Sequence, residues 1–294
     1  MRQAIYSRNT KNKDQGNTSV EWIVLPCLCC QAAGGEYLWA ENVCAAWFLF
    51  HNAARLMDNI EDKDTPDINL PPEISLSAAT GLFFTAQYAI NRLFQHPDTK
   101  NAANDINKAF ISKLLIMCEG QHQDIVQKSP NLKQYWQIAE KKSASFFSLA
   151  TYSGARIATR NRRILKEFEQ YGYHLGLLIQ LLDDLEDIYK WLRSDLTGQH
   201  LSSCLPFIYL IEVLPETEKK LLVEYLAEGM NDHSKKTSVI DTLDKNGAVL
   251  YLFSEIERHS SLAISSLEKA GARSPAKEKL HQIINQLIPP QIIS

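Results

Sequence analysis

Two clusters of acidic residues, each placed beside a long apolar stretch, constrain the fold of this chain more than any other feature. The first follows AAWFLFHNAARLM and contains Asp58 and Asp62, and the second follows YHLGLLIQLL and contains Asp183, Asp184 and Asp187. Carboxylates beside such runs are costly to bury unless positive charge meets them. Asp58 with Asp62, and Asp183 with Asp187, recur at i and i+4 and so share a helix face. These aspartates are the predicted ligands of Mg²⁺, an ion that shares oxygen ligands with substrate phosphates.

The rest of the sequence predicts an all-α fold. No proline occurs between Pro130 and Pro206, glycine is sparse, and no alternating Val-, Ile- or Thr-rich runs are joined by hairpin turns. We expect a single-domain bundle of about ten or more helices around a central apolar cavity. It spans residues 18–294, after a polar arm over 1–17. The expected helices cover 19–33, 36–62, 74–95, 101–128, 131–158, 163–193, 201–213, 216–229, 236–246, 247–271 and 276–288.

The composition is that of an ordinary globular protein. The 294 residues are 45% hydrophobic and 22% charged, with a formal net charge of −3, so no basic excess indicates a nucleic-acid partner. No apolar run is long enough to span a membrane, and the polar N-terminus lacks the apolar core of a secretory signal. The six cysteines have no second Cys/His cluster to complete a zinc site, and we expect them to be buried in a reducing cytoplasm.

The helix faces below the two acidic clusters are expected to enclose the cavity. Gln180 lies on the stripe below Asp183, and Ala54 and then Trp47 lie on the stripe below Asp58. Each helix is thus acidic first, then small or neutral, and then apolar. A cavity with a charged rim and an apolar interior suits a substrate with a diphosphate head and a hydrocarbon tail.

Several motifs in this order resemble those of the trans-isoprenyl diphosphate synthase family, and more loosely the class I isoprenoid synthases. LMDNIED, which ends at Asp62, and QLLDDLED, which ends at Asp187, resemble the two aspartate-rich motifs of that family. Further matching segments lie between them: Gly120-Gln121 with Asp124, Tyr135 through Lys142-Ser143-Ala144, and Gly154-Ala155. The resemblance implies the isoprenoid synthase type of bundle, three Mg²⁺ ions, a homodimer, and contact of Lys142 and Gln180 with the substrate.

The sequence departs from that family where its chain-elongating members bind a second diphosphate. It lacks the family's G-K-x-x-R segment near the N-terminus, and KDTPDINLPP after Asp62 contains no arginine. Gln199 stands where the family has a lysine, which leaves Lys190 or Arg193 as the substitute cation. A second diphosphate would therefore have little to neutralise it. The expected function is a class I terpene synthase, a lyase that ionises an allylic prenyl diphosphate and cyclises the carbocation.

The residues around the expected cavity suggest its depth and lining. In the resembled family, the residues four and five before the first Asp limit chain length, and Ala54 and Ala53 are small, which favours a substrate of C20 or longer. His51 lies near the same face, where a packed, hydrogen-bonded histidine is more common than a ligand. Five aromatic side chains are candidates to line the wall and steady cationic intermediates: Trp47, Phe83, Phe84, Phe146 and Phe147. If Phe83 or Phe84 raised the floor of the cavity, the preference for a long substrate would be reversed.

Two other functions remain open on the sequence. One is a chain-elongating or head-to-head prenyltransferase, whose second basic site comes from residues that the motifs do not identify. The other is a non-catalytic subunit of a heteromeric prenyltransferase, which degenerate aspartate motifs would mark. The last Asp of each motif, Asp62 and Asp187, is present here and argues against such a subunit.

Overall fold

The structure is a computed structural model that describes residues 23–61, 70–127, 130–193, 198–227 and 233–288. These residues form helices and their connections, without a β-strand among them, so the predicted all-α fold is confirmed. The polar arm expected over residues 1–17 lies outside the described residues, as does the predicted metal ligand Asp62.

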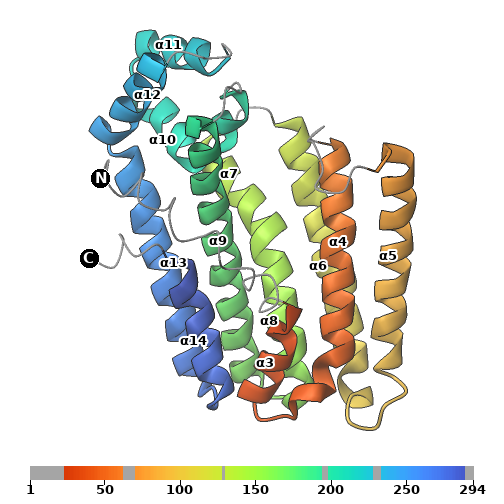
Figure 1. Cartoon of the computed structure of the whole chain (residues 1–294). Coiled ribbons are helices and arrows are strands. Elements are labelled where there is room, and N and C mark those ends of the chain that lie inside the picture. The colour runs from red at the N-terminus through yellow and green to blue at the C-terminus, as the bar shows by residue number, and fades with distance from the viewer. Residues whose placement is uncertain (1–22, 62–69, 128–129, 194–197, 228–232, 289–294) are drawn as a thin grey trace.

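Most of the helices run side by side in one bundle (Figure 1). α4 packs along α5, α9 packs along both α8 and α13, and α6 packs on α8. The main helices are α3 (Leu25–Ala32), α4 (Glu41–Glu61), α5 (Pro72–Arg92), α6 (Lys100–Val126), α7 (Leu132–Ala139), α8 (Ser145–Ala158), α9 (Arg162–Arg193), α10 (Leu205–Val213), α11 (Glu216–Ala227), α12 (His233–Lys245), α13 (Ala248–Ala270) and α14 (Ala276–Leu287). Short helical turns lie between some of them: η1 (Tyr37–Ala40), η2 (Glu140–Ala144) and η3 (Gln199–Ser203).

Local sequence signals explain where two of the helices begin. The Asn131 side chain accepts the backbone N–H of Gln134, and the Gln134 side chain accepts the backbone N–H of Asn131, both at 2.9 Å, ahead of α7. Asn161 caps α9 by accepting the N–H of Arg163 at 3.0 Å. With no proline inside it, α9 runs for 32 residues, or about 48 Å.

The sequence predicted one helix over 131–158, and the structure divides this segment in three. α7 leads into the π turn η2, which leads without a break into α8. A π turn inserts one residue into the helical repeat, and such turns occur frequently at functional sites. A sequence analysis based on 3.6 residues per turn does not detect this insertion. The insertion nevertheless determines where the side chains of η2 point.

Glycines allow α9 to lie against η2 and α8 at backbone distance. A Cβ on Gly176 would lie 2.7 Å from the Ala144 Cα and closer still to the Ser143 carbonyl oxygen. A Cβ on Gly172 would meet the backbone of Phe147 in the same way. This close approach brings the second acidic cluster next to the π turn.

Five of the six cysteines are buried, and Cys118 is exposed. All six are free thiols, with the sulfurs of Cys27 and Cys44 3.0 Å apart in the core between α3 and α4. Across the described residues, no three or more His, Cys, Asp or Glu side chains form a group that could hold a metal by themselves. None of the described helices is both long and apolar enough to cross a membrane.

Candidate active site

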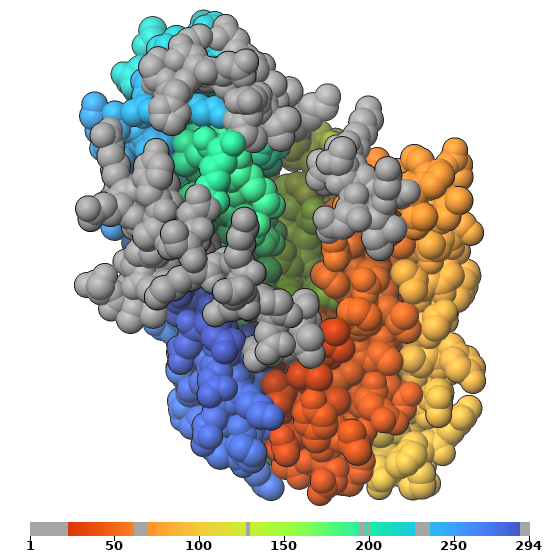
Figure 2. All heavy atoms as spheres, in the orientation of Figure 1, coloured from red at the N-terminus to blue at the C-terminus, as the bar shows by residue number. Residues whose placement is uncertain are grey.

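The two acidic clusters lie toward the same end of the bundle. α4 ends at Glu61, soon after Asp58, and the half of α9 that carries Asp183 and Asp187 points to the same end in Figure 1. Figure 2 shows a hollow on this face, between α9 in green and α4 in orange. α9 continues to Arg193, so its cluster lies within the helix rather than at the C-terminus that the sequence led us to expect.

Gln121 of α6 holds the end of α4. Its side-chain amide donates to Asp58 Oδ1 and to Glu61 Oε2, both at 2.7 Å. These bonds fix the orientation of the Asp58 carboxylate, which is half-buried. Gln121 belongs to a motif that the sequence singled out, but its partner on α4 could not be read from one helix alone.

Lys142 projects from the π turn and forms an ion pair. Its ammonium group lies 2.5 Å from Asp124 Oδ2 of α6, and its side chain is 25% exposed. The neighbouring Lys141 instead pairs with Glu119 at 2.6 Å and donates to Gln123 at 3.1 Å. The π turn thus sends two consecutive lysines to different acidic partners on α6, and holds Lys142 in a fixed position.

A chain of hydrogen bonds joins the π turn to the second acidic cluster. The Ser143 hydroxyl donates to Gln180 Oε1 at 2.8 Å, and the Gln180 amide donates to Asp184 Oδ1 at 3.1 Å. Gln180, predicted to contact substrate, is therefore occupied in orienting η2 and α9 relative to each other. Its side chain is half-buried.

Asp184 is buried and does not fit the predicted role of metal ligand. Its carboxylate is 4% exposed and accepts the Tyr135 hydroxyl and the Leu205 backbone N–H, each at 2.8 Å, besides the Gln180 amide. Burial raises the pKa of Asp184 to about 6, although these three hydrogen bonds favour the ionised form. Asp184 ties α9 to α7 and α10, because it points about 100° away from Asp183 around the helix.

Asp183 is exposed on α9 and lies beside other carboxylates. Its side chain reaches solvent, but the protein around it limits its hydration. Desolvation, followed by the carboxylates of Asp184, Asp187 and Glu186, raises the pKa of Asp183 to about 7, and Lys190 opposes the shift. Such a site favours binding of a cation.

The donor set fits Mg²⁺ shared with a substrate better than a metal enclosed by protein. Asp58, Asp183 and Asp187 supply hard carboxylate oxygens from two helices, and Mg²⁺ commonly takes one or two carboxylates and completes its shell with water and substrate phosphates. Asp183 and Asp187 are one turn apart on an exposed edge, where an ion can reach both. Asp62 was predicted to join this set and lies outside the described residues.

The cations at the end of α9 face acidic or aromatic groups of their own helix. Lys190 lies 3.5 Å from Glu186 and 3.4 Å from Asp187. Arg193, predicted to contact substrate, is exposed with its guanidinium 6.0 Å from the centre of the Tyr189 ring. Lys190 thus contacts the second acidic cluster, whereas Arg193 lies against an aromatic ring.

The predicted lining residues divide into three groups. Phe146 is buried and stacks on Trp47, with ring centroids 4.7 Å apart, on the side of α4 that leads to Asp58. Phe83 is half-buried and packs on Phe50 with ring centroids 5.5 Å apart, whereas Ala53 is fully buried in the packing around α4. Ala54 is half-buried.

The prediction that Phe84 lines the cavity is wrong for the single chain. Its side chain is 74% exposed on the outer face of α5. Neighbouring residues of a helix project about 100° apart, so Phe83 and Phe84 cannot both face inward.

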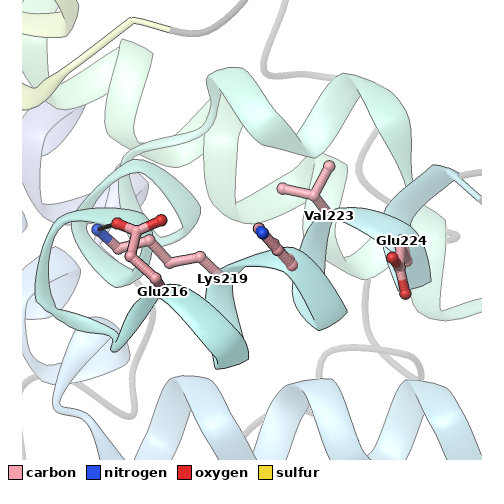
Figure 3. A pocket seen from close by; sticks show the side chains of 5 residues that line it. Glu216, Lys219, Val223 and Glu224 are labelled. Carbon is pink, nitrogen blue, oxygen red and sulfur yellow. Dashed lines mark hydrogen bonds and ion pairs between the residues drawn. The ribbon is translucent and has the colours of Figure 1, made fainter.

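A depression on α11 is unrelated to the acidic clusters. It lies on one helix at the edge of the molecule, and Glu216 and Lys219 pair across part of it at 3.0 Å (Figure 3). Its lining comes from a single helix, α11, which bears none of the aspartates of the two clusters. The lining residues are Glu216, Lys219, Lys220, Val223 and Glu224.

Comparison with protein families assigns the chain to a known family. Residues 22–243 match the family model described as polyprenyl synthetase. This match spans most of the chain, and the chain therefore belongs to the polyprenyl synthetase family. The predicted membership of the trans-isoprenyl diphosphate synthase family, with its fold, is confirmed.

Curated relatives and a solved structure are similar to this chain over most of its length. The chain is 25% identical over 275 residues to a geranylgeranyl diphosphate synthase of Saccharolobus solfataricus, covering 86% of this chain and 80% of that protein. It is 24% identical to tryptophan prenyltransferase ComQ of Bacillus subtilis, covering 78% of this chain and 75% of that protein. The geranylgeranyl pyrophosphate synthetase of Pyrococcus horikoshii superposes with a TM-score of 0.76 at 20% identity, covering 92% of this chain and 85% of that one.

The terpene synthase expected from the sequence is a wrong prediction, and so is the assignment as a lyase. These relatives, which match along most of the chain, carry the names of prenyl diphosphate synthases and prenyltransferases rather than of cyclases. The prediction failed at one step of reasoning. The missing basic site argues against an acceptor that carries a diphosphate, but it does not argue against an acceptor without a diphosphate.

Proposed function

We propose that the protein is a Mg²⁺-dependent prenyltransferase that moves the prenyl group of an allylic diphosphate to an acceptor nucleophile. The observation that carries the proposal is that the end of α4, which bears Asp58, and the second half of α9, which bears Asp183, lie toward one end of the bundle with a hollow between the two helices. The π turn that bears Lys142 packs on α9 and α6. Membership of the polyprenyl synthetase family supports it. By resemblance, we infer three ions.

Each residue of the site has a distinct part in this reaction. When bound, Mg²⁺ neutralises the diphosphate and stabilises it as a leaving group. Asp58, Asp183 and Asp187 hold the ions, and Lys142 turns from Asp124 to the diphosphate oxygens. Gln121 and the Ser143–Gln180 pair keep these groups oriented, so that little reorganisation accompanies cleavage. The Trp47 and Phe146 rings lie below, where an aromatic face steadies the allylic cation.

Two acceptors fit this function, and a different observation favours each. Isopentenyl diphosphate, which gives chain elongation, is supported by the names of the diphosphate synthases among the relatives. A tryptophan side chain is supported by the name of the relative ComQ. It is also supported by the lack of an arginine in residues 63–72, the segment that follows the first aspartate-rich motif. A neutral indole needs no second basic site, which makes this second candidate consistent with the charges of the chain.

One product analysis separates these outcomes. The protein is incubated with Mg²⁺ and allylic diphosphates from C10 to C25, alone, with isopentenyl diphosphate, or with a tryptophan-containing peptide, and products are identified by mass spectrometry. A longer diphosphate indicates elongation, and a peptide heavier by one prenyl group indicates transfer to tryptophan. Asp183→Asn is the inactive control. Failure of the wild type to form either product would contradict the proposal.

We also infer a homodimer, as the family resemblance implies, formed through α5 and α6. Large apolar side chains are exposed on these two helices, including Phe84 at 74%, Tyr88 at 66%, Ile111 at 50% and Leu115 at 66%. Phe84 and Tyr88 lie one turn apart on α5, as do Ile111 and Leu115 on α6, and exposed apolar residues gathered in this way mark a candidate association site. Leu115→Glu should convert a dimer into a monomer in sedimentation experiments, whereas Leu250→Glu, on α13 and 63% exposed, should not. A wild-type monomer at micromolar concentration would contradict this inference.

A further inference from the structure

His51 is a titratable side chain on α4 that has no part in the proposed binding of the diphosphate donor. It lies on α4 seven residues before Asp58, so the two side chains project from the same face, two turns apart. The His51 side chain is exposed, whereas Trp47, one turn earlier, is 3% exposed. His51 therefore stands between the packed interior and the acidic rim.

A stack of aromatic rings positions the imidazole. The His51 ring stacks on Phe146, with centroids 5.8 Å apart and planes at 27°. Phe146 stacks in turn on Trp47 at 4.7 Å and 19°, and the Trp47 indole N–H donates to the Phe146 carbonyl at 3.1 Å. Phe146 follows Lys142 by about one turn, so this stack holds the imidazole near the proposed donor site.

The imidazole nitrogens of His51 have no hydrogen-bond partner among the residues that the structure describes. This differs from the packed, hydrogen-bonded histidine expected from the sequence, and from His174 and His259, whose Nδ1 atoms lie 3.0 Å apart. Although the side chain reaches solvent, the protein around the ring limits its hydration, and this desolvation, followed by the charge of Arg55, lowers the pKa of His51. The ring is therefore neutral at neutral pH. A neutral, unengaged imidazole at an open site can accept a proton.

The nearby carboxylates are less suited to this task. Asp58 accepts from Gln121, Asp124 pairs with Lys142, and Asp184 accepts three hydrogen bonds. Asp183 and Asp187 belong to the proposed metal site. His51 is the base that lies beside the aromatic stack, where the allylic cation and the acceptor would meet.

We propose that His51 accepts the proton that the acceptor loses during prenyl transfer, an inference that rests on the proposed prenyltransferase function. The bond from the allylic carbon to the diphosphate oxygen breaks, and the diphosphate leaves with the electron pair. The π-electrons of the acceptor form the new bond to the allylic carbon, which leaves the positive charge on the acceptor. A proton from a neighbouring carbon or ring nitrogen then passes to the lone pair of His51, and the exposed imidazolium releases it to water.

The test measures the transfer fraction, which is the number of moles of prenylated acceptor formed per mole of diphosphate released. Full-length protein is given Mg²⁺ and geranylgeranyl diphosphate, with isopentenyl diphosphate or N-acetyl-tryptophan amide as acceptor. His51→Phe keeps a ring to stack on Phe146 but removes the base, and we expect the fraction to fall on the order of 100-fold. Prenyl alcohol from water capture takes the place of the transfer product. In His51→Ala, added imidazole should restore part of the transfer, which a purely structural role would not allow.

His96→Ala, in the connection between α5 and α6 at the other end of the bundle, is the control and should keep the wild-type fraction. The inference is overturned if His51→Phe transfers like wild type. It is also overturned if His51→Phe lowers the rate of prenyl transfer and the rate of diphosphate release without acceptor by the same factor. That result would mean that His51 contributes to binding of the allylic diphosphate. His51→Gln is measured in the same way if His51→Phe fails to fold. A wild type that releases no diphosphate, or transfers to neither acceptor, contradicts the proposed function itself.

Discussion

The backbone of Gly176 on α9 lies directly against the carbonyl group of Ser143 in the π turn. A Cβ at position 176 would overlap the Ser143 oxygen and lie 2.7 Å from the Ala144 Cα. Both neighbours are backbone atoms, which cannot move aside as the end of a flexible side chain can. The missing side chain of Gly176 therefore sets the distance between the helix of Asp183 and the turn of Lys142.

Gly176→Ala should push these two elements apart. We expect the free energy of unfolding to fall by about 1–3 kcal/mol, as for other overpacked core sites. The KM for the allylic diphosphate should rise, because Lys142 and the aspartates would no longer be spaced for one diphosphate. Urea unfolding and steady-state kinetics measure the two effects.

Gly81→Ala is the matched control for that substitution. A Cβ at Gly81 on α5 would have no atom within 4 Å, and alanine in a helix is favoured over glycine by about 0.5–1 kcal/mol. This variant should be as stable as wild type or slightly more so. Equal destabilisation at both glycines would show that the contact with Ser143 has no special effect.

Lys142→Gln should remove the charge that the π turn directs to the proposed diphosphate site, if Lys142 leaves Asp124 on substrate binding. We expect kcat/KM for prenyl transfer to fall by about 10²–10³-fold, the usual loss when one group that stabilises developing charge is removed. Lys141→Gln is the control, because Lys141 pairs with Glu119 and Gln123 instead. It should change kcat/KM less than about threefold. Similar losses in both variants would point to general electrostatics rather than to a specific contact.

The positions of two long helices could be predicted closely, because no proline interrupts either segment. Expected helices over 101–128 and 163–193 correspond to α6 at Lys100–Val126 and α9 at Arg162–Arg193, the latter capped by Asn161. The π turn inside 131–158 could not be predicted. Its widening depends on how η2 meets Gly176 on a helix that follows later in the chain.

The aspartate pairs of the candidate site could be predicted from i, i+4 spacing, but the partners of each carboxylate could not. Asp184 is adjacent to Asp183 in sequence, yet it turns toward Tyr135 and the Leu205 N–H, which lie on other helices. Phe84 was placed in the cavity for a similar reason and lies on the outer face of α5. Periodicity tells which residues share a face, and only the packing of other helices tells what that face meets.

Asp183 and Asp184 should differ sharply when replaced by asparagine. Mg²⁺ with inorganic pyrophosphate should raise the Tm of wild type by several degrees, since ligand at 100 times Kd adds about 2.7 kcal/mol. Asp183→Asn should abolish this shift. Asp184→Asn should keep it but lower the starting stability by about 1–3 kcal/mol, because an amide N–H₂ then faces buried donors. A thermal-shift assay measures both, and loss of the shift in Asp184→Asn alone would restore Asp184 as the ligand.

A pair of histidines between α9 and α13 should make folding stability depend on pH. His259 is 2% exposed, and its Nδ1 lies 3.0 Å from that of His174. Burial, and then Arg258, lower the pKa of His174 to about 4 and that of His259 to about 3. Both rings are therefore neutral in the folded protein at pH 5, whereas in the unfolded chain they titrate near 6.5.

The unfolded state thus binds more protons than the folded state once the pH falls below about 6.5, and stability falls with it down to about pH 4. His259→Phe should remove one such group while keeping a ring against Trp136. Between pH 7 and 5, we expect wild type to lose about 1–2 kcal/mol more than this variant in urea unfolding. Asp183 and Asp184, whose raised pKa values act in the opposite direction, are common to both proteins and cancel in the comparison. If the free energy of unfolding falls equally with pH in wild type and variant, the pair is already protonated, or exposed, in the folded protein.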